Sequence, residues 1–338
     1  MIVNTKQAVN YITTAMKAKL VTMIEGDPGI GKSSIVQDIA EQYKLALVDV
    51  RLSQCDPLDM QGMPTVQGDR AVFLPMDLFP LEDTPLPKNK NGFLLFLDEF
   101  NSASLAVQAS SYKLILDKTV GQRKLHPKTV IVAAGNLSTN GAIVNRLSTA
   151  MQSRLVHLEL GTNAEHWTEW ASINKLDHQV ISYIHGRPDN LHNFDPNHND
   201  KTFACPRTWH FVSRIMTAAN GTPLKDLLPL LAGTIGEGVA REFIVYTETF
   251  TRLPTFQQIV TDPLKAKLDN GPALLYAVSH MIAANVTKHN LPAAMKYTAR
   301  MPLEFETITL QNILRRDESM KNEDVIQDWI IEKGDDLF

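Results

Sequence analysis

The sequence predicts an α/β fold in which a parallel sheet is flanked by helices and followed by a helical region. Short apolar runs, which are typical of buried strands, alternate with amphipathic helical segments up to about residue 160. Past residue 161 the strand signal fades, and apolar residues recur at helical spacing. The composition, with 44% hydrophobic and 21% charged residues, is that of a globular protein.

Apolar periodicity justifies each element of the α/β part in turn. Ala8, Ile12 and Ala15 recur at three- and four-residue steps and predict a helix over residues 5–19. Phe93–Phe100 is a nearly continuous apolar run that ends in two acids, as a buried parallel strand does. The same criteria predict strands at 20–25, 45–52, 129–134 and 156–160, and helices at 33–43 and 105–116.

The rest of the chain has helical spacing. The pattern predicts helices at 167–184, 208–219, 224–235 and 237–249, with a polar surface loop at 186–203 and mostly helices beyond 255. We therefore expect three regions, namely an α/β core over residues 1–161, a helical domain over 162–254 and a helical extension over 255–338.

Length, charge and cysteine content limit the class of protein. At about 150 residues per domain, 338 residues suggest two domains, or one large domain with an appendage. The formal net charge of -4 gives the whole chain no general attraction for nucleic acid or an anionic membrane. With Cys55 and Cys205 as its two cysteines, the chain has no disulfide framework. Neither a run of ~20 apolar residues nor a secretory signal is present, so we expect a cytoplasmic protein without membrane association.

A phosphate-binding loop follows the first predicted strand. The motif G-x-x-x-x-G-K-[ST] is matched in full by Gly26-Asp27-Pro28-Gly29-Ile30-Gly31-Lys32-Ser33. The glycines let backbone N–H groups wrap an anion, and the following helix adds the positive end of its dipole. We expect Lys32 to reach the β- and γ-phosphates and Ser33 to bind Mg²⁺, with Ser34 beside them. A chance glycine-rich turn is the alternative, and the strand–turn–helix context argues against it.

Two acids, Asp98 and Glu99, close the apolar run Phe93–Leu97. The carboxyl end of a central parallel strand opens onto the ligand crevice of such sheets. Asp98 is therefore expected near the Mg²⁺ that Ser33 binds, and Glu99 is expected to polarise the water that attacks the γ-phosphate. The alternative is a solvated strand end.

Asn136 and three arginines complete the candidate site. Asn136 ends a predicted strand, where its amide can contact the attacking water and the γ-phosphate, although an asparagine used for a turn is the alternative. Arg146, Arg154 and Arg207 are candidates for an arginine that stabilises charge during phosphoryl transfer. An arginine beyond a sheet edge is better placed to reach a neighbouring subunit than its own site. A surface charge is the alternative for each of them.

These motifs resemble those of AAA+ ATPases in order and spacing, over about residues 20–220. The motifs are Gly26–Ser33, Phe93–Phe100, Ala133–Asn136, Leu147–Leu155 and Cys205–Thr208. The chain looks most like the MoxR branch, because the segment 56–79 is similar to the β-hairpin insertion of that branch. The region after about 250, including Met301–Phe305, resembles bacteriophage-encoded members. The sequence departs from the branch in Asn136-Leu137, where Asn-Pro is usual, and in Ser153-Arg154-Leu155, where Asp-Arg-Phe is usual.

The resemblance implies a P-loop NTPase fold with ATP and Mg²⁺ as cofactors, and it implies a role for each candidate residue. Asp98 and Glu99 correspond to the Walker B pair and Asn136 to sensor 1. Arg154 corresponds to the finger that acts on the adjacent subunit, and Arg146 occupies a second candidate finger position. Arg207 corresponds to sensor 2, on a helical lid that residues 162–254 form.

The resemblance also implies an assembly and a task. Members work as homo-oligomeric rings, usually hexamers, and remodel partner proteins, often beside a protein with a von Willebrand factor A-type domain. A DNA-associated motor or loader remains an alternative, against which the near-neutral net charge weighs. The locally basic segment Lys118–Lys128 is a candidate for a ring pore or a nucleic-acid contact, and a solvated hairpin is the alternative. A nucleotide-timed assembly protein with slow hydrolysis is the other alternative.

Overall fold

The computed structural model describes residues 1–137, 144–196, 200–248 and 253–333. The chain divides into two compact units. The first comprises Met1–Thr162 with Asp195–His198, and the second comprises Asn163–Phe194 with Asn199–Phe338. Within the described residues, no helix combines the length and the apolar character needed to cross a bilayer.

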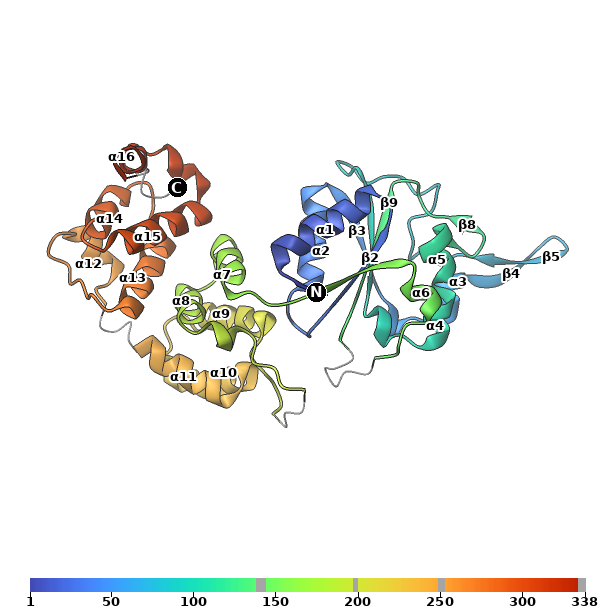
Figure 1. Ribbon diagram of the computed structural model, residues 1–338, viewed down its shortest axis with the longest axis horizontal. Coiled ribbons are helices and arrows are strands. Elements are labelled where there is room, and N and C mark those ends of the chain that lie inside the picture. The colour runs from blue at the N-terminus through green and yellow to red at the C-terminus, as the bar shows by residue number, and fades with distance from the viewer. Residues whose placement is uncertain (138–143, 197–199, 249–252, 334–338) are drawn as a thin grey trace. The chain divides into compact units, whose positions relative to one another are not determined.

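A parallel sheet forms the centre of the first unit (Figure 1). Its described strands follow the order β1-β10-β2-β9-β6-β3, and every adjacent pair is parallel. Their bounds are Ile2–Val3 (β1), Leu155–Leu160 (β10), Val21–Gly26 (β2), Thr129–Gly135 (β9), Gly92–Asp98 (β6) and Leu45–Arg51 (β3). The prediction of a parallel sheet flanked by helices and followed by a helical region is confirmed. Strand β1 was not predicted, because two residues carry no periodic signal.

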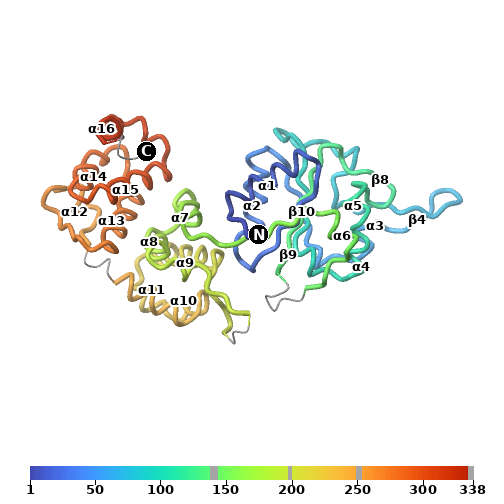
Figure 2. The backbone as a smooth tube through the Cα atoms, viewed as in Figure 1, coloured from blue at the N-terminus to red at the C-terminus, as the bar shows by residue number. Residues whose placement is uncertain are grey.

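Both faces of the sheet are buried. On β6, Leu94 and Phe96 face one side while Leu95 and Leu97 face the other, as the period of two requires. Helices α1 and α2 cover the first face, and helices α3 to α6 cover the second (Figure 2). Their bounds are Thr5–Lys17 (α1), Lys32–Gln42 (α2), Pro57–Gln61 (α3), Leu105–Ser110 (α4), Tyr112–Asp117 (α5) and Thr149–Gln152 (α6).

The helix expected at 105–116 is divided into α4 and α5 at Ser111. The Ser111 hydroxyl donates to the carbonyl oxygen of Val107 at 2.8 Å. A bond from a helical serine to the fourth preceding carbonyl oxygen favours bending of a helix, and here it coincides with the break.

The first unit also contains two antiparallel hairpins. Strands β4 (Met63–Gln67) and β5 (Arg70–Leu74) form the first within the segment 56–79. Strands β7 (Thr119–Val120) and β8 (Arg123–Lys124) form the second. Nine of the ten residues of β4 and β5 are exposed, so this hairpin lies outside the core.

The described part of the second unit is built from helices. The bounds are Ala164–Ile173 (α7), His178–Gly186 (α8), Pro206–Ala219 (α9), Leu228–Ile235 (α10), Glu237–Glu248 (α11), Phe256–Thr261 (α12), Pro272–Asn285 (α13), Leu291–Thr298 (α14), Leu303–Arg316 (α15) and Asp324–Lys333 (α16). The single helix expected at 167–184 is two helices, because Lys175 adopts a left-handed φ of 57° and ends the first. Helices α7 to α11 share one hydrophobic cluster, and helices α12 to α16 share another.

Candidate functional site

The phosphate loop lies where the order of the strands reverses. Strand β2 has β10 on one side and β9 on the other, and the chain leaves β2 for the β3 edge and returns later to β10. In open α/β sheets this arrangement leaves a crevice at the carboxyl ends of the strands. The loop connects the end of β2 to the start of α2, and therefore lies at the carboxyl ends of the strands.

Three glycines permit the backbone conformation of the phosphate loop. Gly29 and Gly31 have φ values of 79° and 100°, in the left-handed region that side chains disfavour. A Cβ on Gly26 would lie 2.8 Å from the carbonyl oxygen of Leu160 on β10. The glycines of the motif are therefore required by this backbone. The Ile30 side chain is buried in the core, and Ser34 is exposed in the first turn of α2.

Lys32 connects the loop to β9. Its side chain is 9% exposed, and its ammonium donates to the carbonyl oxygens of Gly26 at 2.7 Å and Asp27 at 2.9 Å. It also donates to the Oδ1 atom of Asn136 at 3.0 Å. The hydrogen bonds to these oxygens offset the free energy cost of burying the ammonium charge. Lys32 and Asn136, which are 104 positions apart, thus meet at the carboxyl ends of β2 and β9.

Ser33 and Asp98 also meet. The Ser33 hydroxyl donates to Oδ2 of Asp98 at 3.2 Å, across 65 positions of sequence. Magnesium is commonly bound by one or two protein oxygens together with phosphate oxygens and water, so this pair fits the ion. Among the described residues no group of three or more His, Cys, Asp or Glu side chains is arranged to bind a metal. A magnesium ion here would therefore depend on phosphate and water for its other ligands.

Glu99 turns away from the strand that Asp98 ends. Its φ of 54° lies in the left-handed region, which is uncommon for a residue with a side chain. Its backbone N–H donates to Oδ1 of Asp98 at 2.9 Å, and its carboxylate accepts a hydrogen bond from the hydroxyl of Ser53. Ser53 lies in a 3₁₀ turn, Leu52–Gln54, after β3. Sequence analysis did not select Ser53, because nothing local distinguishes this serine from others.

Negative charge gathers at the ends of β3 and β6. Partial desolvation raises the pKa of the Asp49 carboxyl above its usual value, and the charges of Asp98 and Glu99 raise it further. The charge of Arg51 acts in the opposite direction. Carboxylates that lie this close to Asp49 favour the approach of a cation.

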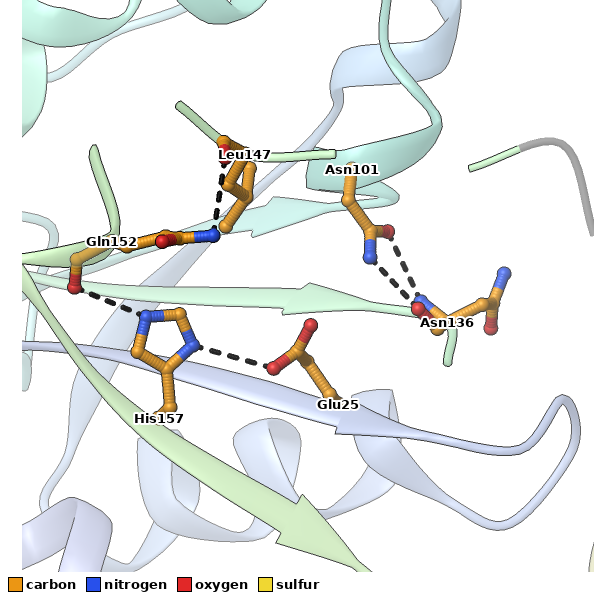
Figure 3. Close-up of polar contacts among 6 residues, drawn as sticks. All are labelled: Glu25, Asn101, Asn136, Leu147, Gln152 and His157. Atoms are coloured by element: carbon orange, nitrogen blue, oxygen red, sulfur yellow. Dashed lines mark hydrogen bonds and ion pairs between the residues drawn. The ribbon is translucent and has the colours of Figure 1, made fainter. Parts of the chain in front are cut away.

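A reciprocal pair of hydrogen bonds holds the end of β9 (Figure 3). Asn101 donates from Nδ2 to the carbonyl oxygen of Asn136 at 2.8 Å, and accepts at Oδ1 from the Asn136 N–H at 3.1 Å. Gly135 is required beside it, because a Cβ there would lie 2.3 Å from Oδ1 of Asn101. Asn101 is a further site residue that sequence analysis missed, although its position directly after the acids and Phe100 was a usable signal.

The three candidate arginines lie in two places. Arg146 and Arg154 are exposed on the first unit, on either side of α6. The Arg154 guanidinium donates to the carbonyl oxygen of Ala150 in that helix. Arg207 is exposed near the start of α9 in the second unit. Because the two units are separate bodies, a role for Arg207 at the phosphate loop stays a prediction.

The basic segment Lys118–Lys128 is partly neutralised. Arg123 is 2.8 Å from a carboxylate oxygen of Asp83 and 3.7 Å from one of Glu82. Lys118 donates to the carbonyl oxygen of Thr129 at 3.0 Å, and burial lowers the pKa of its ammonium. These contacts weaken the case for a nucleic-acid surface at this hairpin.

Comparison with known proteins shows that part of this unit is similar to AAA domains. Residues 22–155 match the family of AAA domains of the dynein-related subfamily. A stretch of 99 residues, 28% of this chain, is 35% identical to midasin of Giardia intestinalis, of whose length the chain spans 2%. The matched domain runs from β2 to the first residue of β10, and contains the loop, both acids and Asn136.

Similar solved structures are distant in sequence. The RuvB Holliday junction branch migration motor of Thermotoga maritima is 16% identical, with a TM-score of 0.38 over 77% of this chain and 75% of that one. A putative ATPase from Cytophaga hutchinsonii is 14% identical, with a TM-score of 0.36 over 98% and 88% of the two chains.

Proposed function

We propose that this chain is an AAA+ module that hydrolyses ATP with Mg²⁺. The contact between Ser33 and Asp98 carries the proposal, because it joins the phosphate loop to the acid pair as magnesium-dependent phosphoryl transfer requires. The match of residues 22–155 to the AAA domain family supports it.

Each residue at the crevice has a task in this proposal. Lys32 exchanges part of its contacts with loop carbonyl oxygens for contacts with the β- and γ-phosphates, and the loop N–H groups bind the same phosphates. Ser33 and Asp98 hold Mg²⁺, which when bound offsets the negative charge of the phosphates. Glu99 polarises the attacking water, and Asn136 orients that water against the γ-phosphate.

We further propose that the module is MoxR-like and works as a homo-oligomeric ring, with six subunits as the expected number. Arg154 then completes the site of the neighbouring subunit, Arg146 is the alternative finger, and Arg207 acts as sensor 2. Arg146 and Arg154 are both exposed beside α6, which supports an intersubunit role.

The task of the ring, in this proposal, is to remodel a partner protein through the β4–β5 hairpin. Val66 is 78% exposed and Leu74 is 60% exposed on this hairpin. An isolated two-stranded hairpin is marginally stable in water, so apolar side chains on it favour a protein contact. A partner with a von Willebrand factor A-type domain is the expectation from the resemblance.

The test combines calorimetry with turnover measurements. We expect wild-type protein to bind Mg·ATP, and Lys32→Ala to lose that binding. Glu99→Gln should bind Mg·ATP normally but lower turnover by about 10²–10⁴-fold, the usual contribution of a general base. Absence of heat with Mg·ATP, or unchanged turnover in Glu99→Gln, would reject the proposal. Native mass measurement of Glu99→Gln with ATP, after affinity capture, tests the ring and its partner.

One observation favours the alternative of a nucleotide-timed assembly protein with slow hydrolysis. The Ser53 hydroxyl donates a hydrogen bond to the carboxylate of Glu99, and this leaves the carboxylate less available to accept a proton from water. A turnover that stays slow in the assembled ring, with assembly controlled by nucleotide, would favour this function over a remodelling motor.

A further inference from the structure

His157 on β10 connects two parts of the first unit that the proposed reaction uses (Figure 3). Its Nδ1 atom is 3.3 Å from Oε2 of Glu25, and its Nε2 atom is 3.2 Å from the carbonyl oxygen of Gln152. The ring therefore lies between the end of β2 and the end of α6.

The chemistry of the two partners requires a donor at each ring nitrogen. An ionised carboxylate and a backbone carbonyl oxygen both only accept hydrogen bonds. A neutral imidazole has a single N–H and leaves one partner unmet, whereas the imidazolium donates to both. The contacts of His157 with Glu25 and Gln152 are called the bridge below. Both are hydrogen bonds when the ring carries a proton on each nitrogen.

Each end of the bridge lies beside a residue of the candidate site. Glu25 precedes Gly26, the first glycine of the phosphate loop. Gln152 is the last residue of α6, two positions before Arg154, and its side chain donates to the carbonyl oxygen of Leu147 at 3.2 Å. Leu147 follows Arg146, so the bridge reaches both ends of the segment 146–154 that carries the two candidate fingers.

Helix α6 needs such a connection. It has four residues, which is too short to be stable without tertiary contacts. Buried Met151 anchors its apolar side, and Ser148 caps its N-terminus by accepting from the Met151 N–H at 3.2 Å. The Gln152 carbonyl at its C-terminus is held by His157.

We propose that His157 is a positioning residue that holds the segment 146–154 in place relative to the phosphate loop, so that its arginine is presented to the neighbouring subunit. This inference rests on the proposed function, since it requires that the finger acts between subunits. It assigns to His157 no contact with the nucleotide bound in its own subunit.

Two variants separate the effect of the hydrogen bonds of His157 from the effect of the volume of its ring. His157→Phe keeps an aromatic ring of similar size without donors, and His157→Arg keeps a donor for each of the two acceptors. Loss of the hydrogen bonds should lower turnover in His157→Phe by about ten-fold, with Mg·ATP affinity within about two-fold of wild type. His157→Arg should recover most of that loss. Equal turnover in wild type and His157→Phe, or a loss of affinity as large as the loss of turnover, would overturn the inference.

Mixed rings test whether the defect lies in the donated arginine. Glu99→Gln subunits are expected to hydrolyse ATP about 10²–10⁴-fold more slowly but still donate an intact finger, so adding them should raise turnover per His157→Phe subunit. Adding Glu99→Gln subunits that also carry Arg154→Ala should not. No rise in the first mixture, under conditions in which the same addition rescues Arg154→Ala, would overturn the role of His157 and leave the proposed function intact. Wild-type turnover in Arg154→Ala alone would instead reject the intersubunit finger itself.

A double variant gives an independent reading. If His157 acts through Arg154, then His157→Phe should have no further effect on turnover in an Arg154→Ala background. A full ten-fold additional loss would show that His157 acts elsewhere and would overturn the inference.

Discussion

At the scale of single residues, the chemistry of the site depends on how the acids at the end of β6 are held. Asp98 accepts from Ser33 and from the backbone of Glu99, so its two oxygens are both engaged. Glu99 reaches Ser53 because its left-handed backbone turns it off the strand. The structure therefore presents the expected base in a state that a neighbouring hydroxyl restrains.

Removal of that hydroxyl should increase basal turnover. In Ser53→Ala the carboxylate of Glu99 loses a hydrogen bond worth about 1–2 kcal/mol, which we expect to raise turnover by up to about ten-fold. Steady-state ATP hydrolysis by the purified protein measures the effect. Ser53→Thr keeps the hydroxyl and serves as the control. Lower turnover in Ser53→Ala than in Ser53→Thr would contradict this role of Ser53.

Asn101 holds the backbone of the candidate site residue Asn136 in place. Asn101→Ala removes both bonds to the backbone of Asn136 at a buried position, which should lower the free energy of unfolding by about 2–3 kcal/mol and reduce turnover. Asn101→Asp keeps the acceptor but replaces the donor, so it should lose at least as much. Urea unfolding and ATP hydrolysis measure the two effects. A stability within 0.5 kcal/mol of wild type, roughly the range of ordinary surface changes, would contradict the prediction.

At the scale of elements, the packing of α8, α13 and α15 in the second unit buries a histidine that must stay neutral. His280 on α13 faces His178 and His185 of α8 and Arg315 and Arg316 of α15. Its Nδ1 atom is 3.3 Å from Nδ2 of Asn312 on α15. Burial, first of all, and these cationic groups lower the pKa of His280 to about 3.

This packing should make stability depend on pH. The folded-state pKa of His280 lies below the value of about 6.5 in the unfolded chain, so the unfolded state binds more protons between these values. The stabilisation is fully present above about pH 6.5 and is lost as the pH falls toward 3. Burial also lowers the pKa of His185 and His178, which adds to the same trend.

Urea unfolding between pH 7 and pH 5 measures this dependence. His280→Gln should show a shallower loss of stability than wild type, whereas His289→Gln, at an exposed position, should match it. Equal slopes for wild type and His280→Gln would contradict the assignment to His280.

At the scale of the whole molecule, the proposed assembly depends on the exposed arginines of the first unit. Arg154 contacts the backbone of its own helix α6, and it must leave this contact to reach a phosphate elsewhere. If the Arg154 side chain moves from the backbone of α6 to a phosphate in the neighbouring subunit, then hydrolysis in that subunit depends on Arg154.

Substitution of the arginine should therefore separate binding from turnover. In Arg154→Ala we expect unchanged Mg·ATP affinity and a loss of turnover of about 10³-fold or more, as for arginine fingers in general. Arg146→Ala is the matched comparison on the other side of α6, and a small effect there would assign the finger to Arg154. Turnover that stays at the wild-type level in Arg154→Ala would mean that this arginine is a surface charge.

Local patterns were sufficient for the parallel core and for the phosphate loop. The apolar run Phe93–Leu97 predicted a buried strand, and the spacing of Gly26, Gly31 and Lys32 predicted a loop between a strand and a helix. The division of the helix at 105–116 was not predictable, since its apolar spacing continues through Ser111. The existence of β1 was not predictable either, since a two-residue pairing with β10 decides it.

The sequence by itself determined the α/β class, the loop and the chemical types of the candidate residues, because each of these is encoded within a few consecutive positions. The sequence also predicted that Asp98 lies near Ser33, because both follow strands of one parallel sheet. Only the tertiary structure decided that Asn101 holds Asn136, that Ser53 restrains Glu99 and that His157 joins Glu25 to α6. These contacts join residues 5 to 132 positions apart. The order and register of the parallel strands bring them together, and no local pattern of residues specifies that order.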